Sequence, residues 1–174
     1  MKIKLPPRKF SESIKINCNK KTVYDILGNS KNVRKWSVYV HHIEPINKIT
    51  GGKLGSRRRC YRNKDESNMR WDEEVILDKK YQTRRLSIYN LSGFLLKINH
   101  LFTEQIYKKA GPGKTLLTFT VFLDRKKSTV LDILIFNCVV YKIKSVFRKN
   151  LENIKHLAEP VERKKRYQRI YPFY

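Results

Sequence analysis

Three ionisable side chains interrupt segments of this chain in which apolar residues alternate with polar ones. Glu73 lies in one such segment, and His100 and Glu104 lie in another. A histidine beside a carboxylate can act as a general acid–base pair, and Tyr89 could donate a hydrogen bond to a developing enolate. These residues are therefore the catalytic candidates. A single histidine on a strand is more often structural, and no complete catalytic motif contains them.

A run of arginines, at positions 57, 58, 59 and 62, precedes the segment of Glu73. If both segments are β-strands, the alternation of side chains turns two of these arginines toward the core in either register. A carboxylate in an apolar interior is costly unless it is paired and hydrogen-bonded. We therefore expect a Glu–Arg pair across neighbouring strands. Such a pair can anchor the polar head of a ligand, or it can serve only as a buried or rim ion pair.

Hydrophobic periodicity and turn residues predict the elements that must position these side chains. Residues 10–18 alternate as in a half-buried strand, and two short helices are expected at residues 20–27 and 32–36. Six further strands, separated by turns rich in Gly, Asn and Asp, are expected near residues 37–48, 54–63, 69–78, 84–91, 95–108 and 114–124. Strands at this spacing predict one strongly bent antiparallel sheet.

One long helix is predicted from Thr129 to Ala158, with Asp132 completing its N-cap signal and Pro160 ending it. About 30 residues at a rise of 1.5 Å make a rod of roughly 45 Å. After a run of antiparallel strands, such a helix can bury its apolar side only by lying across the sheet. Its first part, residues 130–141, is apolar nearly all the way round, which predicts burial on all sides. The side away from the sheet would be covered by a loop, a second subunit or lipid.

This order of elements resembles the START-like or SRPBCC superfamily, which includes polyketide cyclases, birch-pollen-allergen-like proteins and lipid-transfer domains. The resemblance covers about residues 9–160 and rests on the layout together with Trp36, Gly51-Gly-x-x-Gly55 and Trp71-x-Glu73-x-Val75. It implies an α+β helix-grip fold, in which a curved antiparallel sheet of about seven strands wraps around a long C-terminal helix. It also implies an apolar cavity between the sheet and the helix.

The resemblance implies binding or transport of a hydrophobic or amphipathic small molecule or lipid in that cavity. Assigning the more apolar face of each strand to the interior gives the candidate ligand-binding residues Trp71, Glu73, Arg59, Tyr89, His100, Phe102, Phe119, Phe136 and Val140. Some relatives catalyse cyclisation or dehydration in this cavity, so a polyketide cyclase-like or dehydratase-like enzyme using His100, Glu104 or Glu73 is the alternative. Because no family catalytic motif can be placed on this sequence, we expect a protein that is not an enzyme.

The charge is the second strong feature of the sequence. Lysine and arginine number 39 against 15 acidic residues, which gives a formal net charge of +24. This imbalance predicts attraction to an anionic partner, such as a phospholipid surface, an acidic protein or nucleic acid. Peripheral contact with an anionic membrane is therefore expected, and a basic nucleic-acid-associated protein is a second alternative. We expect one domain at residues 1–160, followed by a basic, flexible tail at 161–174.

The remaining signals argue against several other classes of protein. Cys18, Cys60 and Cys138 lack C-x-x-C spacing, so neither a disulfide framework nor a zinc site is indicated. His41 and His42 would face opposite sides of a strand and have no further ligands nearby in the sequence, so we predict no metal site and no cofactor. Without a secretion signal or a long apolar run, the protein is expected to be cytoplasmic. The sequence leaves its oligomeric state open.

Overall fold

The computed structural model describes residues 8–49, 52–94, 100–123 and 130–170, which form seven strands and three helices. In chain order they are β1 (Arg8–Ile16), α1 (Lys20–Gly28), α2 (Ser30–Trp36), β2 (His42–Pro45), β3 (Arg57–Tyr61), β4 (Arg70–Lys79), β5 (Thr83–Ser92), β6 (His100–Lys109), β7 (Thr115–Leu123) and α3 (Val130–Ile170). This is the order predicted from the sequence. The predicted strand near residues 37–48 is shorter than expected, because only four residues pair and Pro45, which lacks an N–H group, ends the strand.

All seven strands form one antiparallel sheet in the order β1-β7-β6-β5-β4-β3-β2. Strands that follow one another from β2 to β7 are neighbours, and β1 completes the sheet beside β7. Residues opposite each other in the register share a face of the sheet. Leu117 and Leu123 of β7 pack in the core with side chains of α3. We call their side of the sheet the α3 side and the opposite side the outer side.

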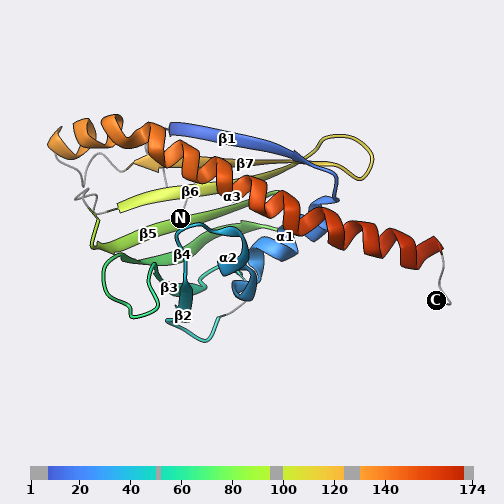
Figure 1. Ribbon diagram of the computed structural model, residues 1–174, viewed down its shortest axis with the longest axis horizontal. Coiled ribbons are helices and arrows are strands. Elements are labelled where there is room, and N and C mark those ends of the chain that lie inside the picture. The colour runs from blue at the N-terminus through green and yellow to red at the C-terminus, as the bar shows by residue number, and fades with distance from the viewer. Residues whose placement is uncertain (1–7, 50–51, 95–99, 124–129, 171–174) are drawn as a thin grey trace.

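Two asparagines define the short helices between β1 and β2. The side chain of Asn19 accepts a hydrogen bond from the Thr22 N–H at 3.0 Å and caps α1, while Asn29 accepts one from the Lys31 N–H at 3.0 Å and caps α2. Both helices are amphipathic and bury one side in the core. They lie at one end of the sheet, against the second half of α3 (Figure 1).

Helix α3 has 41 residues, so at 1.5 Å per residue it is about 60 Å long. It runs diagonally across the sheet and packs against β1, α1 and α2 (Figure 1). The prediction that Pro160 ends this helix is wrong, since the helix continues to Ile170. A proline removes one backbone hydrogen bond from a helix but does not always terminate it.

Two carboxylates explain why the helix continues past the proline. Glu162 is only 4% exposed and accepts hydrogen bonds from Asn19 Nδ2 at 2.7 Å and Thr22 Oγ1 at 3.3 Å. One turn earlier, Glu159 accepts a hydrogen bond from the Asn17 N–H at 2.9 Å. The helix is thus tied to the junction between β1 and α1 on both sides of residue 160.

The core between the sheet and the helices consists of two clusters. The larger one joins β1, β7, α1, α2 and the second half of α3, and its largest members include Ile16, Val23, Trp36, Leu117, Phe119, Leu151 and Ile154. The smaller one joins the first half of α3 to β1 and β7 and contains Phe10, Val121, Leu123 and Phe136. The alternation predicted for β7, with Leu117, Phe119, Val121 and Leu123 on one face, is confirmed.

The first half of α3 is not buried on all sides, so that prediction is wrong. Phe136 is 1% exposed and faces the sheet, whereas Val130, Leu134 and Tyr141 are 76%, 57% and 80% exposed. The three exposed positions share one helical face because they are four and seven residues apart. No helix among the described residues is long and apolar enough to cross a membrane.

Candidate functional site

An ion pair and an indole form a polar group on the α3 side of the sheet. Arg58 of β3 lies opposite Glu73 of β4, and its Nε and Nη2 donate to Glu73 Oε2 at 2.8 and 2.6 Å. Trp71 Nε1 donates to the second carboxylate oxygen, Oε1, at 2.9 Å. The side chains of Arg58 and Glu73 are 13% and 12% exposed. The predicted Glu–Arg pair across strands is therefore confirmed.

The charges of this group are mutually stabilised. Burial alone would lower the pKa of Arg58, but the attraction of Glu73, its hydrogen bonds and the contribution of Cys60 together outweigh burial, so the pKa is raised and the guanidinium stays charged. Burial, followed by the negative charge of Glu73, raises the pKa of the neighbouring Cys60 thiol well above its usual value. Cys60 is therefore a neutral core thiol rather than a nucleophile.

Apolar side chains with accessible surface surround this polar group. Ile88 of β5 lies opposite Glu73, and Leu101 of β6 lies opposite Ile88, so all three share the α3 side. Trp71, Ile88 and Leu101 are only partly buried, although they face the helix. Val140 and Ile143 of α3 are likewise only partly buried where they pack against the smaller core cluster. The polar group is thus fixed beside apolar surface that the core does not fully cover.

Five of the predicted ligand-binding residues lie on the α3 side of the sheet or on α3 facing it: Trp71, Glu73, Phe119, Phe136 and Val140. Phe119 and Phe136 are 5% and 1% exposed, so they supply packing rather than accessible surface. The prediction places Trp71, Glu73 and Val140 correctly beside partly exposed apolar surface. Their contact with a ligand stays a prediction.

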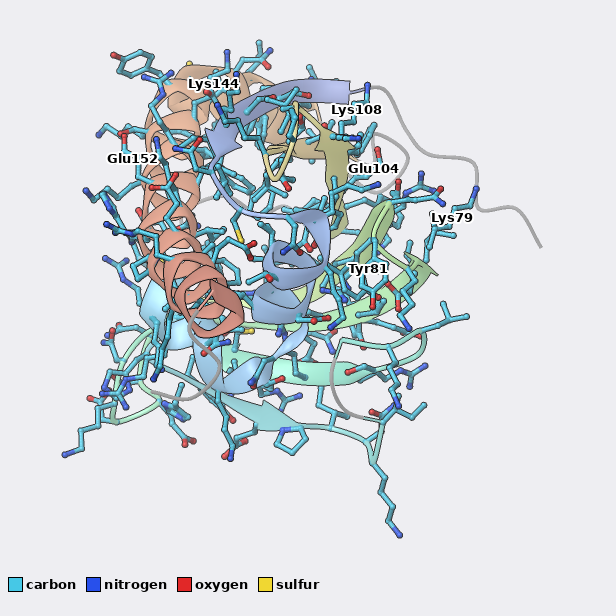
Figure 2. All side chains as sticks on the ribbon, turned by 90° about the vertical axis from the view of Figure 1, so that its right-hand side faces the viewer. Lys79, Tyr81, Glu104, Lys108, Lys144 and Glu152 are labelled. Carbon is cyan, nitrogen blue, oxygen red and sulfur yellow. The ribbon has the colours of Figure 1, made fainter. Side chains whose placement is uncertain are left out.

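The other four, Arg59, Tyr89, His100 and Phe102, lie on the outer side, so the expectation that they face inward is wrong. Leu101 and Tyr107 pack in the core, and the alternation of β6 therefore turns Phe102 and Glu104 outward. In Figure 2, Glu104 and Lys108 lie on the side of the sheet away from α3. Lys144 and Glu152, which belong to α3, mark the opposite side. For β6, the inward face was predicted one residue out of phase. Apolar residues occupy both faces of this strand, so the sequence pattern does not show which face points to α3.

The predicted catalytic pairs are not formed. His100 and Glu104 are four residues apart on one strand, a separation of about 13 Å, and Glu73 lies on the other side of the sheet. Each of the outer residues has a different neighbour. Ser87 Oγ lies 2.7 Å from His100 Nε2, and Arg85 Nη2 lies 2.5 Å from Glu104 Oε1. These residues therefore cannot act together as the acid–base pair expected from the sequence.

A second polar network lies on the outer side around Asp72, which is 3% exposed. Arg59 Nε and Nη2 donate to its two oxygens at 2.7 and 3.0 Å, and Asn90 Nδ2 donates at 2.8 Å. Burial alone would raise the pKa of Asp72, but these hydrogen bonds and the charge of Arg59 outweigh it and hold the pKa below its usual value. Arg59, a predicted ligand residue, is thus engaged in holding neighbouring strands together.

Arg84 is the largest fully buried side chain among the described residues, and no sequence pattern singled it out. Its Nε lies 3.6 Å from Asp78 Oδ1, and its guanidinium lies 4.2 Å from the centre of the Tyr24 ring, while Tyr24 donates a hydrogen bond to Asp78. A Cβ added at Gly52 would lie 3.1 Å from the Arg84 Cζ. The backbone of Gly28, 3.0 Å from that Cβ, and the positive φ of 64° at Gly52 also require a glycine at position 52. In sequence Arg84 is one of two adjacent arginines, a pattern typical of solvent-exposed positions.

A depression of about 340 Å³ lies at the end of the β3–β4 hairpin and is lined by Arg62, Asn63, Asn68, Met69 and Gly93. Arg62 and Met69 are the next pair in the β3–β4 ladder, because the Arg62 N–H donates to the Met69 carbonyl at 3.0 Å. Met69 and Trp71 are two positions apart, so both side chains point to the α3 side. The depression thus adjoins the polar group at one end of the sheet.

Comparison with known proteins identifies the fold. The sequence matches no protein-family profile and no curated protein. The structure of Ara h 8.0201 is similar with a TM-score of 0.64 at 14% identity, over 86% of this chain and 95% of that one. Truncated norcoclaurine synthase from Thalictrum flavum gives 0.63 at 10% identity, over 90% and 97% of the two chains. Major latex-like protein 151 from Panax ginseng gives 0.60 at 11% identity, over 86% and 95%.

The chain has the START-like helix-grip fold. Similarity at this level of identity shows the fold alone, because START-like proteins place different chemistry on one scaffold. The similar region includes the sheet and the helices, and the resemblance inferred from the sequence is confirmed at the level of fold. Within this START-like fold, the Arg58–Glu73–Trp71 group lies on the sheet face that packs against the long helix.

Proposed function

We propose that the protein binds an apolar or amphipathic small molecule between the sheet and α3. The apolar part would contact Trp71, Ile88 and Leu101, and the polar head would meet the Arg58–Glu73 pair. The observation that carries this proposal is the nearly enclosed ion pair beside apolar side chains that face the helix and yet keep accessible surface. An apolar surface with a few fixed polar groups is the usual composition of a small-molecule site.

One structure with the same fold supports a small organic molecule as the class of ligand. Norcoclaurine synthase from Thalictrum flavum has been solved in complex with dopamine and hydroxybenzaldehyde. We favour binding over catalysis for the present chain, because the residues considered for acid–base chemistry lie apart and on different sides of the sheet. Ligand identity would follow from mass spectrometry of the molecules that co-purify with the protein.

The exposed face of α3 extends the proposal to the source of the ligand. Arg148 lies seven residues beyond Tyr141 on the same helical face as Leu134, and Lys142 and Lys149 adjoin it, all of them exposed. Apolar side chains flanked by basic ones suit the surface of an anionic membrane. We infer that this face rests on such a membrane while an amphipathic ligand enters or leaves.

Two matched ion pairs provide the test of the binding proposal. Glu73–Arg58 on the α3 side and Glu104–Arg85 on the outer side have similarly low exposure. We expect Glu73→Gln to change the dissociation constant of a fluorescent fatty acid at least tenfold, and Glu104→Gln to leave it within twofold. Glu73→Gln frees Arg58 from its partner, so Arg58 should bind the carboxylate of the fatty acid more tightly and lower the dissociation constant. Equal effects of the two variants, or no effect of either, would contradict the proposal.

A further inference from the structure

Three side chains with metal-binding atoms converge at the edge of the sheet formed by β2. His42 and Glu44 are two residues apart on β2 and so share one face, and Glu66 reaches them from the β3–β4 loop. His42 Nε2 lies 3.1 Å from Glu66 Oε1, and the ligand atoms of all three residues lie within 4.8 Å of one another. The chain backbone at Glu66 is left-handed, with φ of 59°, which turns this residue back toward the strand.

Neighbouring residues hold two of these side chains in place. The His42 ring stacks on Tyr61, with ring centres 4.6 Å apart and an interplanar angle of 15°. The Tyr61 hydroxyl donates a hydrogen bond to Glu44 Oε2 at 2.9 Å. His42 Nε2 lies within hydrogen-bond distance of Glu66 Oε1, so a bound metal would displace the proton on Nε2. His42 Nδ1 could then donate to His41 Nδ1, which lies 3.4 Å away. Such outer contacts orient the ligands of natural metal sites.

The cluster brings carboxylates together although the molecule as a whole is strongly basic. Glu44 and Glu66 bring two carboxylates together in a chain whose net charge is +24. Arg59, which lies opposite Glu44 in the register, is bonded to Asp72 through two nitrogens and so does not serve as their partner. A cation bound between the two carboxylates would balance this charge.

We propose that His42 Nε2, Glu44 and Glu66 bind a divalent transition-metal ion, for which Zn²⁺ is the best match. One imidazole nitrogen and two carboxylate oxygens are ordinary zinc ligands, and three protein ligands leave a fourth position for water. Ligand atoms in a tetrahedral zinc site are roughly 3.4 Å apart, given bonds of about 2.1 Å. Glu66 is exposed and lies in a loop, so rotation of its side chain can close the remaining distance, while Glu44 keeps one carboxylate oxygen on Tyr61.

The proposed ion would join the edge strand to the β3–β4 loop, which also carries Asn63 and Asn68 of the depression. The site lies on the outer side of the sheet and is independent of ligand binding on the α3 side. This site is not predictable from the sequence because Glu66 is 24 residues from His42 in the chain. Only the return of the hairpin brings the third ligand to the histidine.

Titration with ZnCl₂, followed by isothermal calorimetry, tests the proposal. We expect one zinc per chain at neutral pH, with binding weakened at least tenfold in His42→Gln and in Glu66→Gln. The matched controls are His156→Gln, which removes an exposed histidine of α3, and Cys138→Ser, which removes an exposed thiol. Both controls should retain full binding.

Co²⁺ absorption spectra distinguish the proposed ligands from other ones. A d–d spectrum without a thiolate charge-transfer band is expected, and Glu66→Gln should abolish it. The proposal is overturned if zinc does not bind saturably, if binding survives Glu66→Gln, or if it is lost in Cys138→Ser. Far-ultraviolet circular dichroism checks that each variant is folded. Glu66→Gln is the decisive variant because its side chain is 48% exposed and lies in a loop.

Discussion

At the scale of single residues, the distinction that matters is which side of the sheet a charged pair occupies. Arg58–Glu73 and Arg85–Glu104 are alike in chemistry and burial, yet only the first adjoins apolar side chains that face the helix. Sequence alone predicted that a Glu–Arg pair would form across strands. The sequence could not show whether Arg58 or Arg59 faces α3, because the two side chains point to opposite sides of the sheet. Each lies opposite a carboxylate of β4, Glu73 or Asp72.

The outer network around Asp72 has a consequence for stability against pH. The pKa of Asp72 is lower in the folded protein than its usual value of 3.8, so the folded state favours the ionised carboxylate. The corresponding stability is fully present above pH 4 or so and is lost as the pH falls through the lower, folded pKa. We expect Asp72→Asn to cost about 1–3 kcal/mol at pH 7, because Arg59 loses its charged partner.

Urea unfolding of both proteins between pH 2 and pH 7 measures this effect. The difference between wild type and Asp72→Asn should shrink as the pH falls, since protonation removes the same interaction from the wild type. A difference that stays constant down to pH 2 would show that Asp72 contributes through packing rather than through its charge. Asp25→Asn, which breaks only an exposed pair with Lys21 on α1, is the matched control and should change stability little.

At the scale of the elements, β6 and α3 show where periodicity succeeds and where it fails. β7 has one apolar face and was assigned correctly, whereas β6 has apolar residues on both faces and was assigned one residue out of register. Phe102 is 7% exposed on the outer side, where Phe122 and Ser87 lie opposite it, so its apolarity does not mark the core. The end of α3 was missed because the anchoring hydrogen bonds of Glu162 come from residues about 140 positions away.

The exposed face of α3 predicts a measurable contact with anionic membranes. We expect the protein to co-sediment with vesicles that contain phosphatidylserine and not with vesicles of phosphatidylcholine alone, and to be released by high salt. Leu134→Asp should reduce binding to the anionic vesicles at least fivefold. Val161→Asp, an exposed position of the same helix, introduces the same charge and should have a smaller effect. Binding that ignores the charge of the lipid, or equal loss in both variants, would contradict the membrane proposal.

At the scale of the whole molecule, fold and function draw on different information. The order of strands and helices was predictable because turns and periodicity are local, and the structural neighbours confirm the START-like fold. The accessible surface beside Trp71 and Ile88 was not predictable, because it depends on how closely α3 approaches the middle of the sheet. In the sheet, Arg57, Arg59 and Arg85 each form an ion pair with an acidic residue of the neighbouring strand. These arginines therefore do not contribute to the excess of positive charge, which comes from other residues.

A tryptophan at position 88 tests the proposed ligand site most directly. Ile88 on the α3 side and Ile106 on the outer side are both partly buried, and each can be changed to tryptophan. We predict that Ile88→Trp weakens binding of a fluorescent fatty acid at least tenfold, because the larger ring occupies the space the ligand needs, while Ile106→Trp binds as the wild type does. Equal affinities in the two variants, or no saturable binding by the wild type, would contradict the account.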